Sequence, residues 1–149
     1  ILNCAKDQKC IIKMIDENIL NNIYEFAINY NRPTVLSRRM LQTICRAACN
    51  ITVFLRLGNL RINSGQLGTI VSSLTVTREF CIEDSVFDGF NEPIKVNANG
   101  KPMLRVFDIY TSEITFEQIK NIFIGLSACK QFVKNLSHVE VSETPLQKE

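Results

Sequence analysis

Six cysteines, spread over the whole chain, constrain the fold more than any other feature of the sequence. They are Cys4, Cys10, Cys45, Cys49, Cys81 and Cys129. An even number of cysteines in a chain of domain size is typical of disulfide frameworks in oxidising compartments. We therefore expect three disulfides, whose pairing the spacing alone does not select. Six buried free thiols in a cytosolic protein are the alternative.

The stretch TICRAACNIT, residues 43–52, joins two of these cysteines to a glycosylation signal. Cys45 and Cys49 are one helical turn apart, a spacing near the upper limit for a disulfide, so we expect each to bridge a different neighbour. Asn50 begins an N-x-[ST] sequon and Asn135 begins a second, Asn50 being the favoured glycan site. Cysteines and sequons together favour a secreted, extracellular glycoprotein.

Length and composition indicate one globular domain over residues 1–149, with a flexible polar tail at 138–149. A net charge of +2 gives no electrostatic basis for binding nucleic acid or an anionic membrane. No apolar run reaches the roughly 20 residues that span a bilayer. The first ten residues lack the organisation of a signal peptide, and they are compatible with a mature N-terminus left after cleavage.

Apolar periodicity predicts two long helices in the first half of the chain. The first covers residues 11–30 and ends near Asn31, ahead of Pro33. Its apolar positions recur at spacings of three and four: Ile12, Ile15, Ile19, Ile23, Phe26 and Tyr30. The second runs from about Ser37 to Leu57, where Gly58-Asn59 offers a helix stop. In that helix Asn50 falls on the polar side.

The middle of the chain mixes helix and strand signals. Residues 60–82 fit either a short helix capped by Ser64 or, from the β-branched run TIVSSLTVT, a strand. We expect a short helix followed by extended chain. Residues 83–93 are rich in turn formers and predict a loop. Residues 94–110 predict a β-hairpin that turns at Asn99-Gly100, although Pro102 weakens it.

The last predicted helix has the clearest N-terminal signal. Thr115 and Gln118 have the spacing of a capping box, and Ile114 and Ile119 are placed as a hydrophobic staple. An apolar stripe continues from there to about residue 136. The elements together predict a mainly α (α+β), disulfide-stabilised domain of three or four helices, with a small β-hairpin before the C-terminal helix and no internal repeat.

Residues suited to catalysis, metal binding or cofactor binding are scarce. His138 is the only histidine and falls in the predicted tail, so no triad of the familiar type has a positioned base. The cysteine spacing does not supply the paired ligands of a structural zinc site. Gly65 and Gly68 lack the spacing and the basic residue of a nucleotide-binding loop. We therefore predict no catalytic, cofactor or metal residues, and expect a protein that is not an enzyme.

Two functions fit these features. The first is a secreted recognition protein, cytokine-like or otherwise a ligand for a receptor or protein partner, with Arg38, Arg39 and Arg46 as candidate contacts. The second is an extracellular carrier that holds a small hydrophobic ligand between helices. Its candidate pocket residues are Ile23, Phe26, Phe123 and Leu126. We favour recognition, because each long apolar stripe can be matched to a core partner.

Two families share part of this pattern. The series Cys10, Cys45, Cys49 and Cys81 is similar to the beginning of the helical disulfide framework of insect odorant-binding proteins, but the later close cysteine pair is absent. The chain also resembles short-chain helical cytokines in size and in its long terminal helices, although those proteins have four helices and three are secure here. Neither resemblance is specific enough to transfer functional residues.

Overall fold

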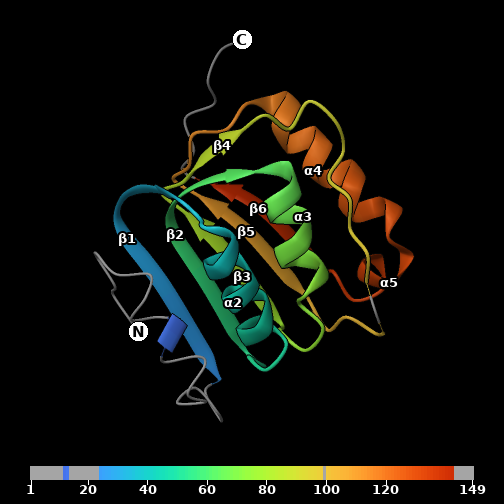
Figure 1. Ribbon diagram of the computed structural model, residues 1–149. Coiled ribbons are helices and arrows are strands. Elements are labelled where there is room, and N and C mark those ends of the chain that lie inside the picture. Colours follow the sequence, from blue (N-terminus) through green and yellow to red (C-terminus); the bar gives the residue numbers. More distant parts are fainter. Residues whose placement is uncertain (1–11, 14–23, 99, 143–149) are drawn as a thin grey trace.

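The chain alternates strands and helices, and the computed structural model describes residues 12–13, 24–98 and 100–142 (Figure 1). The elements are β1 (Glu25–Val35), α2 (Arg38–Ala48), β2 (Phe54–Asn63), α3 (Ser64–Ser72), β3 (Glu79–Glu83), β4 (Val86–Asp88), β5 (Val106–Tyr110), α4 (Phe116–Ala128), α5 (Lys130–Val133) and β6 (His138–Ser142). Strand and helix contribute about equally, so the fold is α/β. The prediction of a mainly helical domain was wrong.

All strand pairs of the six-stranded sheet are parallel. The order is β1-β2-β3-β5-β6, and the short β4 pairs with β2 beyond the end of β3. Along this path each strand is added on the same side of the one before it. Because such crossovers are right-handed, a sheet that grows in one direction places its helices on one face. Figure 1 shows α2, α3 and α4 on that face.

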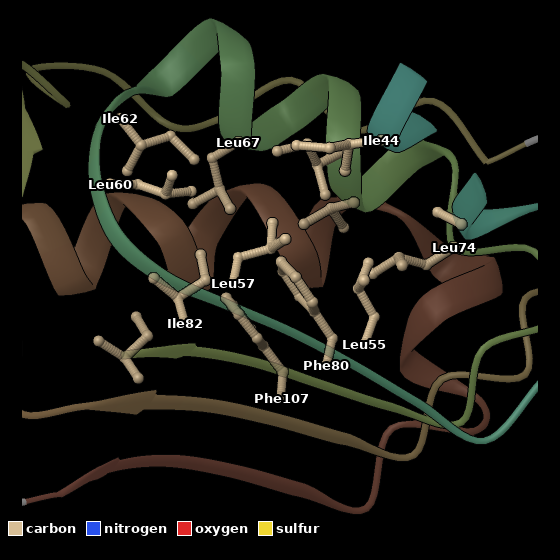
Figure 2. Close-up of a cluster of buried hydrophobic side chains, with 14 of the residues drawn as sticks. Ile44, Leu55, Leu57, Leu60, Ile62, Leu67, Leu74, Phe80, Ile82 and Phe107 are labelled. Carbon is tan, nitrogen blue, oxygen red and sulfur yellow. The ribbon is translucent and has the colours of Figure 1, made fainter. Parts of the chain in front are cut away.

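The core lies between this face of the sheet and the helices (Figure 2). Alternate residues of each strand point into it, and strand pairing aligns them in rows. One row contains Phe26, Leu55, Phe80, Phe107 and Val139, and the next contains Ile28, Leu57, Ile82, Ile109 and Val141. The rings of Phe80 and Phe107 stack with centroids 5.3 Å apart. Full burial of each such side chain contributes about 1.5–3 kcal/mol.

Equivalent inward-facing positions of the strands recur at unequal intervals along the chain. Phe26, Leu55, Phe80, Phe107 and Val139 occupy equivalent positions and follow one another at intervals of 29, 25, 27 and 32 residues. The unequal intervals explain why no fixed period was visible.

The first predicted helix was wrong over residues 25–30, which belong to β1. Phe26, Ile28 and Tyr30 are buried, so the period of two is the one that the structure uses. β1 also continues through Pro33, with a shift of register between Asn29 and Thr34. Proline is tolerated there because β1 is an edge strand. Residues 12–13 are helical, as predicted, and residues 11 and 14–23 lie outside the described part of the chain.

The second predicted helix begins correctly and ends too late. Ser37 caps α2 by accepting a hydrogen bond of 3.1 Å from the backbone N–H of Met40. α2 stops at Ala48, and β2 starts at Phe54, within the range expected to be helical. The Gly58-Asn59 pair is not a helix stop but an irregularity inside β2, where Asn59 has a φ of 55°. The alternation of β2 therefore changes phase after Leu57.

Of the predictions for residues 60–149, some were confirmed and others were wrong. The short helix followed by extended chain is confirmed as α3 and β3, although Asn63 rather than Ser64 provides the cap. The β-hairpin was wrong, because residues 94–98 form no strand and β5 pairs in parallel with β3. The capping box of Thr115 and Gln118 is confirmed. Residues 138–142, placed in the expected tail, form β6.

The structure contains no disulfide among its described cysteines. Cys45, Cys49, Cys81 and Cys129 are free thiols, whereas Cys4 and Cys10 lie outside the described residues. The prediction of a disulfide-stabilised domain was therefore wrong for these four. A continuous core formed by strands and helices supplies the stability that a small disulfide scaffold obtains from cross-links.

We expect thiol labelling of the native protein to follow burial. Cys49 is exposed and should react first, whereas Cys81 should react last, because burial raises the pKa of its thiol to about 11 and the thiolate is the reactive form. Peptide mapping after timed alkylation without reductant, in native buffer and in urea, measures this order. Modification of these cysteines only after reduction would contradict the free-thiol assignment.

Candidate functional site

The side of the sheet that faces away from the helices is the candidate site, and we call it the open face. Its rows are Glu25, Phe54, Glu79, Val106 and His138; then Ala27, Arg56, Cys81, Asp108 and Glu140; then Asn29, Gly58, Glu83, Tyr110 and Ser142. None of the helices α2 to α5 covers these rows. Residues 12–13 are also helical, and Ile12 is buried. Parallel sheets usually have both faces covered, so this surface requires an explanation.

Negative charge dominates the open face. Its carboxylates are Glu25, Glu79, Glu83, Asp108 and Glu140, and its cationic or titratable basic side chains are Arg56 and His138. The whole chain carries a formal charge of +2. The acidic residues are therefore concentrated on this face, because the chain as a whole is not acidic. Closely spaced like charges on adjacent strands are destabilising unless something offsets them.

A hollow of about 430 Å³ lies at the β1–β2 end of the open face. Its lining includes Glu25, Ala27, Phe54, Arg56 and Glu83. Ala27 leaves space because its side chain is short. Arg56 lies over the Phe54 ring, 5.1 Å from its centroid, and its Nη1 is 3.6 Å from Glu83 Oε2. Since the Arg56 side chain is 44% exposed, that ion pair adds little stability.

Three potential ligands cluster at the β5–β6 end of the open face. One ligand atom from each of Asp108, His138 and Glu140 lies within 4.8 Å of the others. His138 Nε2 is 3.0 Å from Glu140 Oε2. This hydrogen bond raises the pKa of His138 and lowers the pKa of Glu140. Burial raises the pKa of Asp108, whose Oδ1 atom has no hydrogen-bond partner.

Cys81 lies between these two ends and is not an activated nucleophile. Its side chain is buried in the row between Arg56 and Asp108. Burial raises the pKa of its thiol to about 11, above that of an ordinary thiol, and Arg56 offsets only part of this. A catalytic cysteine requires the opposite shift. The geometry of the open face therefore favours binding over nucleophilic chemistry.

The arginines predicted as partner contacts lie on the opposite side of the molecule. Arg38, Arg39 and Arg46 project from α2 and line one groove of about 1030 Å³, which also includes Cys45 and Thr69. Arg46 Nη2 donates a hydrogen bond of 3.4 Å to Thr43 Oγ1. The structure thus brings the three arginines together, but apart from the open face.

The two predicted glycosylation sites are exposed. Asn50 follows α2 in a turn, and its Nδ2 donates a bond of 3.3 Å to the carbonyl of Arg46. Asn135 follows α5, and its Nδ2 donates a bond of 2.6 Å to the carbonyl of Pro102. Both sites are sterically open, and glycosylation stays a prediction.

The residues predicted to form an apolar pocket are not brought together. Phe26 is buried on β1, whereas Phe123 is 38% exposed and Leu126 is buried, both on α4. Figure 1 shows β1 and α4 in different parts of the molecule. Ile23 lies outside the described residues. No helix in the described part of the chain is long and apolar enough to cross a membrane.

The sequence does carry a signal for the open face, although the sequence analysis missed it. Five pentapeptides have apolar residues at their second and fourth positions and more varied residues at the others: EFAIN, FLRLG, EFCIE, VFDIY and HVEVS. Each pentapeptide is a strand segment, and its odd positions form the open face. Aligning these five short segments, rather than searching for long helical stripes, would have identified both faces of the sheet.

Comparisons with known proteins do not assign this chain to a family. No family model, no curated protein and no solved structure matched it. The function is therefore inferred from the site alone.

Proposed function

We propose that this chain is a non-enzymatic recognition protein that binds a basic segment of a protein partner on its open face. The observation that carries the proposal is a parallel sheet with one face that helices α2 to α5 leave uncovered, and five carboxylates lie in the rows of that face. Fold alone does not define function, so the argument depends on the chemistry of this surface. Three properties of the open face support the proposal: its rigidity, its charge and its hollow.

The strands hold the open-face side chains in a fixed arrangement. Paired residues on β2, β3 and β5 lie in rows that backbone hydrogen bonds define, and the core beneath them is filled. Such a surface loses little conformational entropy when it binds, which favours affinity.

The chemistry of the open face suits lysine and arginine side chains. Glu25 and Glu79 are exposed and can form charge-assisted hydrogen bonds with a cationic partner. Tyr110, also exposed, offers an aromatic face to a cation. The hollow beside Ala27 has room for a single side chain. Complementary charge increases association rate and specificity more than it increases raw affinity.

This proposal retains the class of function predicted from the sequence but assigns the binding to a different surface. Recognition stays the favoured function, but the contact surface changes from Arg38, Arg39 and Arg46 to the open face. Because the fold contains a parallel sheet, the resemblance to helical cytokines does not hold. Secretion also stays a prediction, and the free thiols remove one of its supports. Of the pocket residues predicted for a hydrophobic carrier, the described ones, Phe26, Phe123 and Leu126, do not converge.

We expect the protein to bind a Lys/Arg-rich peptide more tightly than a Glu-rich peptide of equal length. The variant Glu25→Lys/Glu79→Lys should weaken binding of the basic peptide by about tenfold or more, because each change replaces attraction with repulsion. Fluorescence anisotropy at two salt concentrations measures both effects, and added salt should weaken binding.

Glu92→Lys/Glu117→Lys is the matched control, because both residues are exposed outside the rows of the open face and the two substitutions change the net charge as much as Glu25→Lys/Glu79→Lys does. This control should retain nearly the wild-type affinity. Equal loss in the control and the open-face variant would indicate a general charge effect and would overturn the proposed site. Equal binding of the basic and acidic peptides would overturn the proposed partner chemistry.

A further inference from the structure

We propose that Asp108, His138 and Glu140 form a binding site for a divalent transition-metal ion, with Zn²⁺ as the best match. Their ligand atoms all lie within 4.8 Å of one another. A ligand set of one imidazole and two carboxylates suits Zn²⁺, and a tetrahedral ion with three protein ligands keeps one position for water. The site shares the open face with the proposed peptide-binding surface, but its test measures stability with metal and no peptide.

Strand pairing explains why the three side chains converge. Asp108 on β5 and Glu140 on β6 are register partners, so their side chains leave the same face side by side. His138 precedes Glu140 by two residues and therefore lies on the same face of β6. The site is thus built on paired backbone and not on a loop, which favours fixed ligand geometry.

An unsatisfied oxygen atom is a second and independent observation. Asp108 Oδ1 is buried and has no hydrogen-bond partner in the described part of the chain. A buried carboxylate oxygen without a partner is costly and uncommon in folded proteins. A metal ion between Asp108 and Glu140 would give this oxygen a ligand bond.

Charge repulsion supports the same site. Asp108 and Glu140 are carboxylates directly opposite each other on neighbouring strands, an arrangement that destabilises a sheet. His138 contacts Glu140 at 3.0 Å, which offsets only part of that charge when the imidazole is protonated. A divalent cation would neutralise both carboxylates.

Metal binding at this position would stabilise the pairing of the edge strand β6 with β5. β6 is the last strand in the sheet order and pairs with β5. An ion held by Asp108 on β5 and by His138 and Glu140 on β6 would link the two strands through their side chains. Because the ion binds the folded chain, it should raise the melting temperature and slow amide exchange in β6.

The test compares thermal unfolding of the full chain in chelator and in Zn²⁺. Wild type should gain about 5 °C or more at a hundredfold excess of Zn²⁺ over its Kd. Asp108→Asn and His138→Gln should lose most of this gain, whereas Glu79→Gln, on the same face but outside the cluster, should keep it. Circular dichroism in chelator verifies that each variant is folded. If Asp108→Asn does not fold, the comparison between wild type and His138→Gln, a substitution at an exposed position, is sufficient for the test.

Thiols also bind zinc, and Cys45, Cys49 and Cys129 are all at least partly exposed, so the background for this experiment is Cys45→Ser/Cys49→Ser/Cys129→Ser. In that background, the spectrum of bound Co²⁺ should show nitrogen and oxygen ligands, and amide exchange in β6 should slow when Zn²⁺ is added. The inference is overturned if Zn²⁺ does not stabilise the wild type, if Asp108→Asn and His138→Gln respond as Glu79→Gln does, or if Co²⁺ shows thiolate ligation alone.

Discussion

Phe80→Ala should lower the free energy of unfolding by about 3–5 kcal/mol, the usual cost of removing a large aromatic side chain from a core. Phe80 is 1% exposed and stacks on Phe107 with an interplanar angle of 9°. It lies in the central row of inward-facing residues, between Leu55 and Phe107. The substitution removes this contact and leaves a cavity that the rigid strands fill poorly. Urea denaturation monitored by circular dichroism measures the loss.

Phe54→Ala is the matched control for Phe80→Ala. Phe54 is also on a strand and pairs with Glu79, one position before Phe80, but its side chain lies on the open face. It is only partly buried and contacts Arg56. We expect a loss of about 1 kcal/mol or less, typical of a surface substitution. Equal losses for the two variants would contradict the assignment of inward and outward faces.

Gly125→Ala should destabilise the protein by about 1–3 kcal/mol, the range seen when a packed core is given extra volume. In an exposed helix the same change would stabilise by about 1 kcal/mol, because alanine has the higher helix propensity. Gly125 lies in α4 against Ile94, and an added Cβ would overlap the backbone carbonyl of Ile94 and its Cγ1 atom. Backbone atoms cannot move aside cheaply, so the steric cost exceeds the gain in propensity. Thermal and urea unfolding measure the result.

Gly65→Ala is the control for this steric argument. Gly65 is in the first turn of α3, and the nearest atom to an added Cβ is Asn63 Oδ1 at 3.5 Å, an ordinary contact. Here the propensity gain should appear, as an increase of up to about 1 kcal/mol. A stabilising Gly125→Ala would show that α4 does not pack closely on Ile94.

Local features of the fold could be predicted from the sequence, because they depend on bonds between near neighbours. Ser37 begins α2 by binding an amide three residues away. Thr115 and Gln118 form a reciprocal capping box over the same distance. In each case the side chain and its partner belong to one turn of helix, so the sequence contains the whole interaction.

The type of the longer elements could not be predicted in the same way. Phe26 and Tyr30 fit a helical spacing of four, and with Ile28 they fit a strand spacing of two equally well. The strand is selected by its pairing with β2, whose residues Leu55 and Leu57 lie far along the chain. A strand segment with only two or three inward-facing residues has too few apolar positions to reveal its period.

The candidate site was missed for a related reason. Glu79 and Val106 are neighbours on the open face but are separated in the chain by a long connection in which the structure describes no helix. Asp108 and Glu140 meet only because β5 and β6 pair. The disulfide prediction failed because an even cysteine count indicates a compartment and does not determine which thiols the fold brings together.

The most direct test of recognition on the open face is NMR mapping of the complex with the Lys/Arg-rich peptide. Titration of the ¹⁵N-labelled protein should shift the amides of β1, β2 and β3, with the largest changes near Glu25, Glu79 and Glu83. The amides of α2 near Arg38 and Arg39 should change little. Shifts concentrated on α2, or no shifts on the strands at a peptide concentration that saturates binding, would contradict the account.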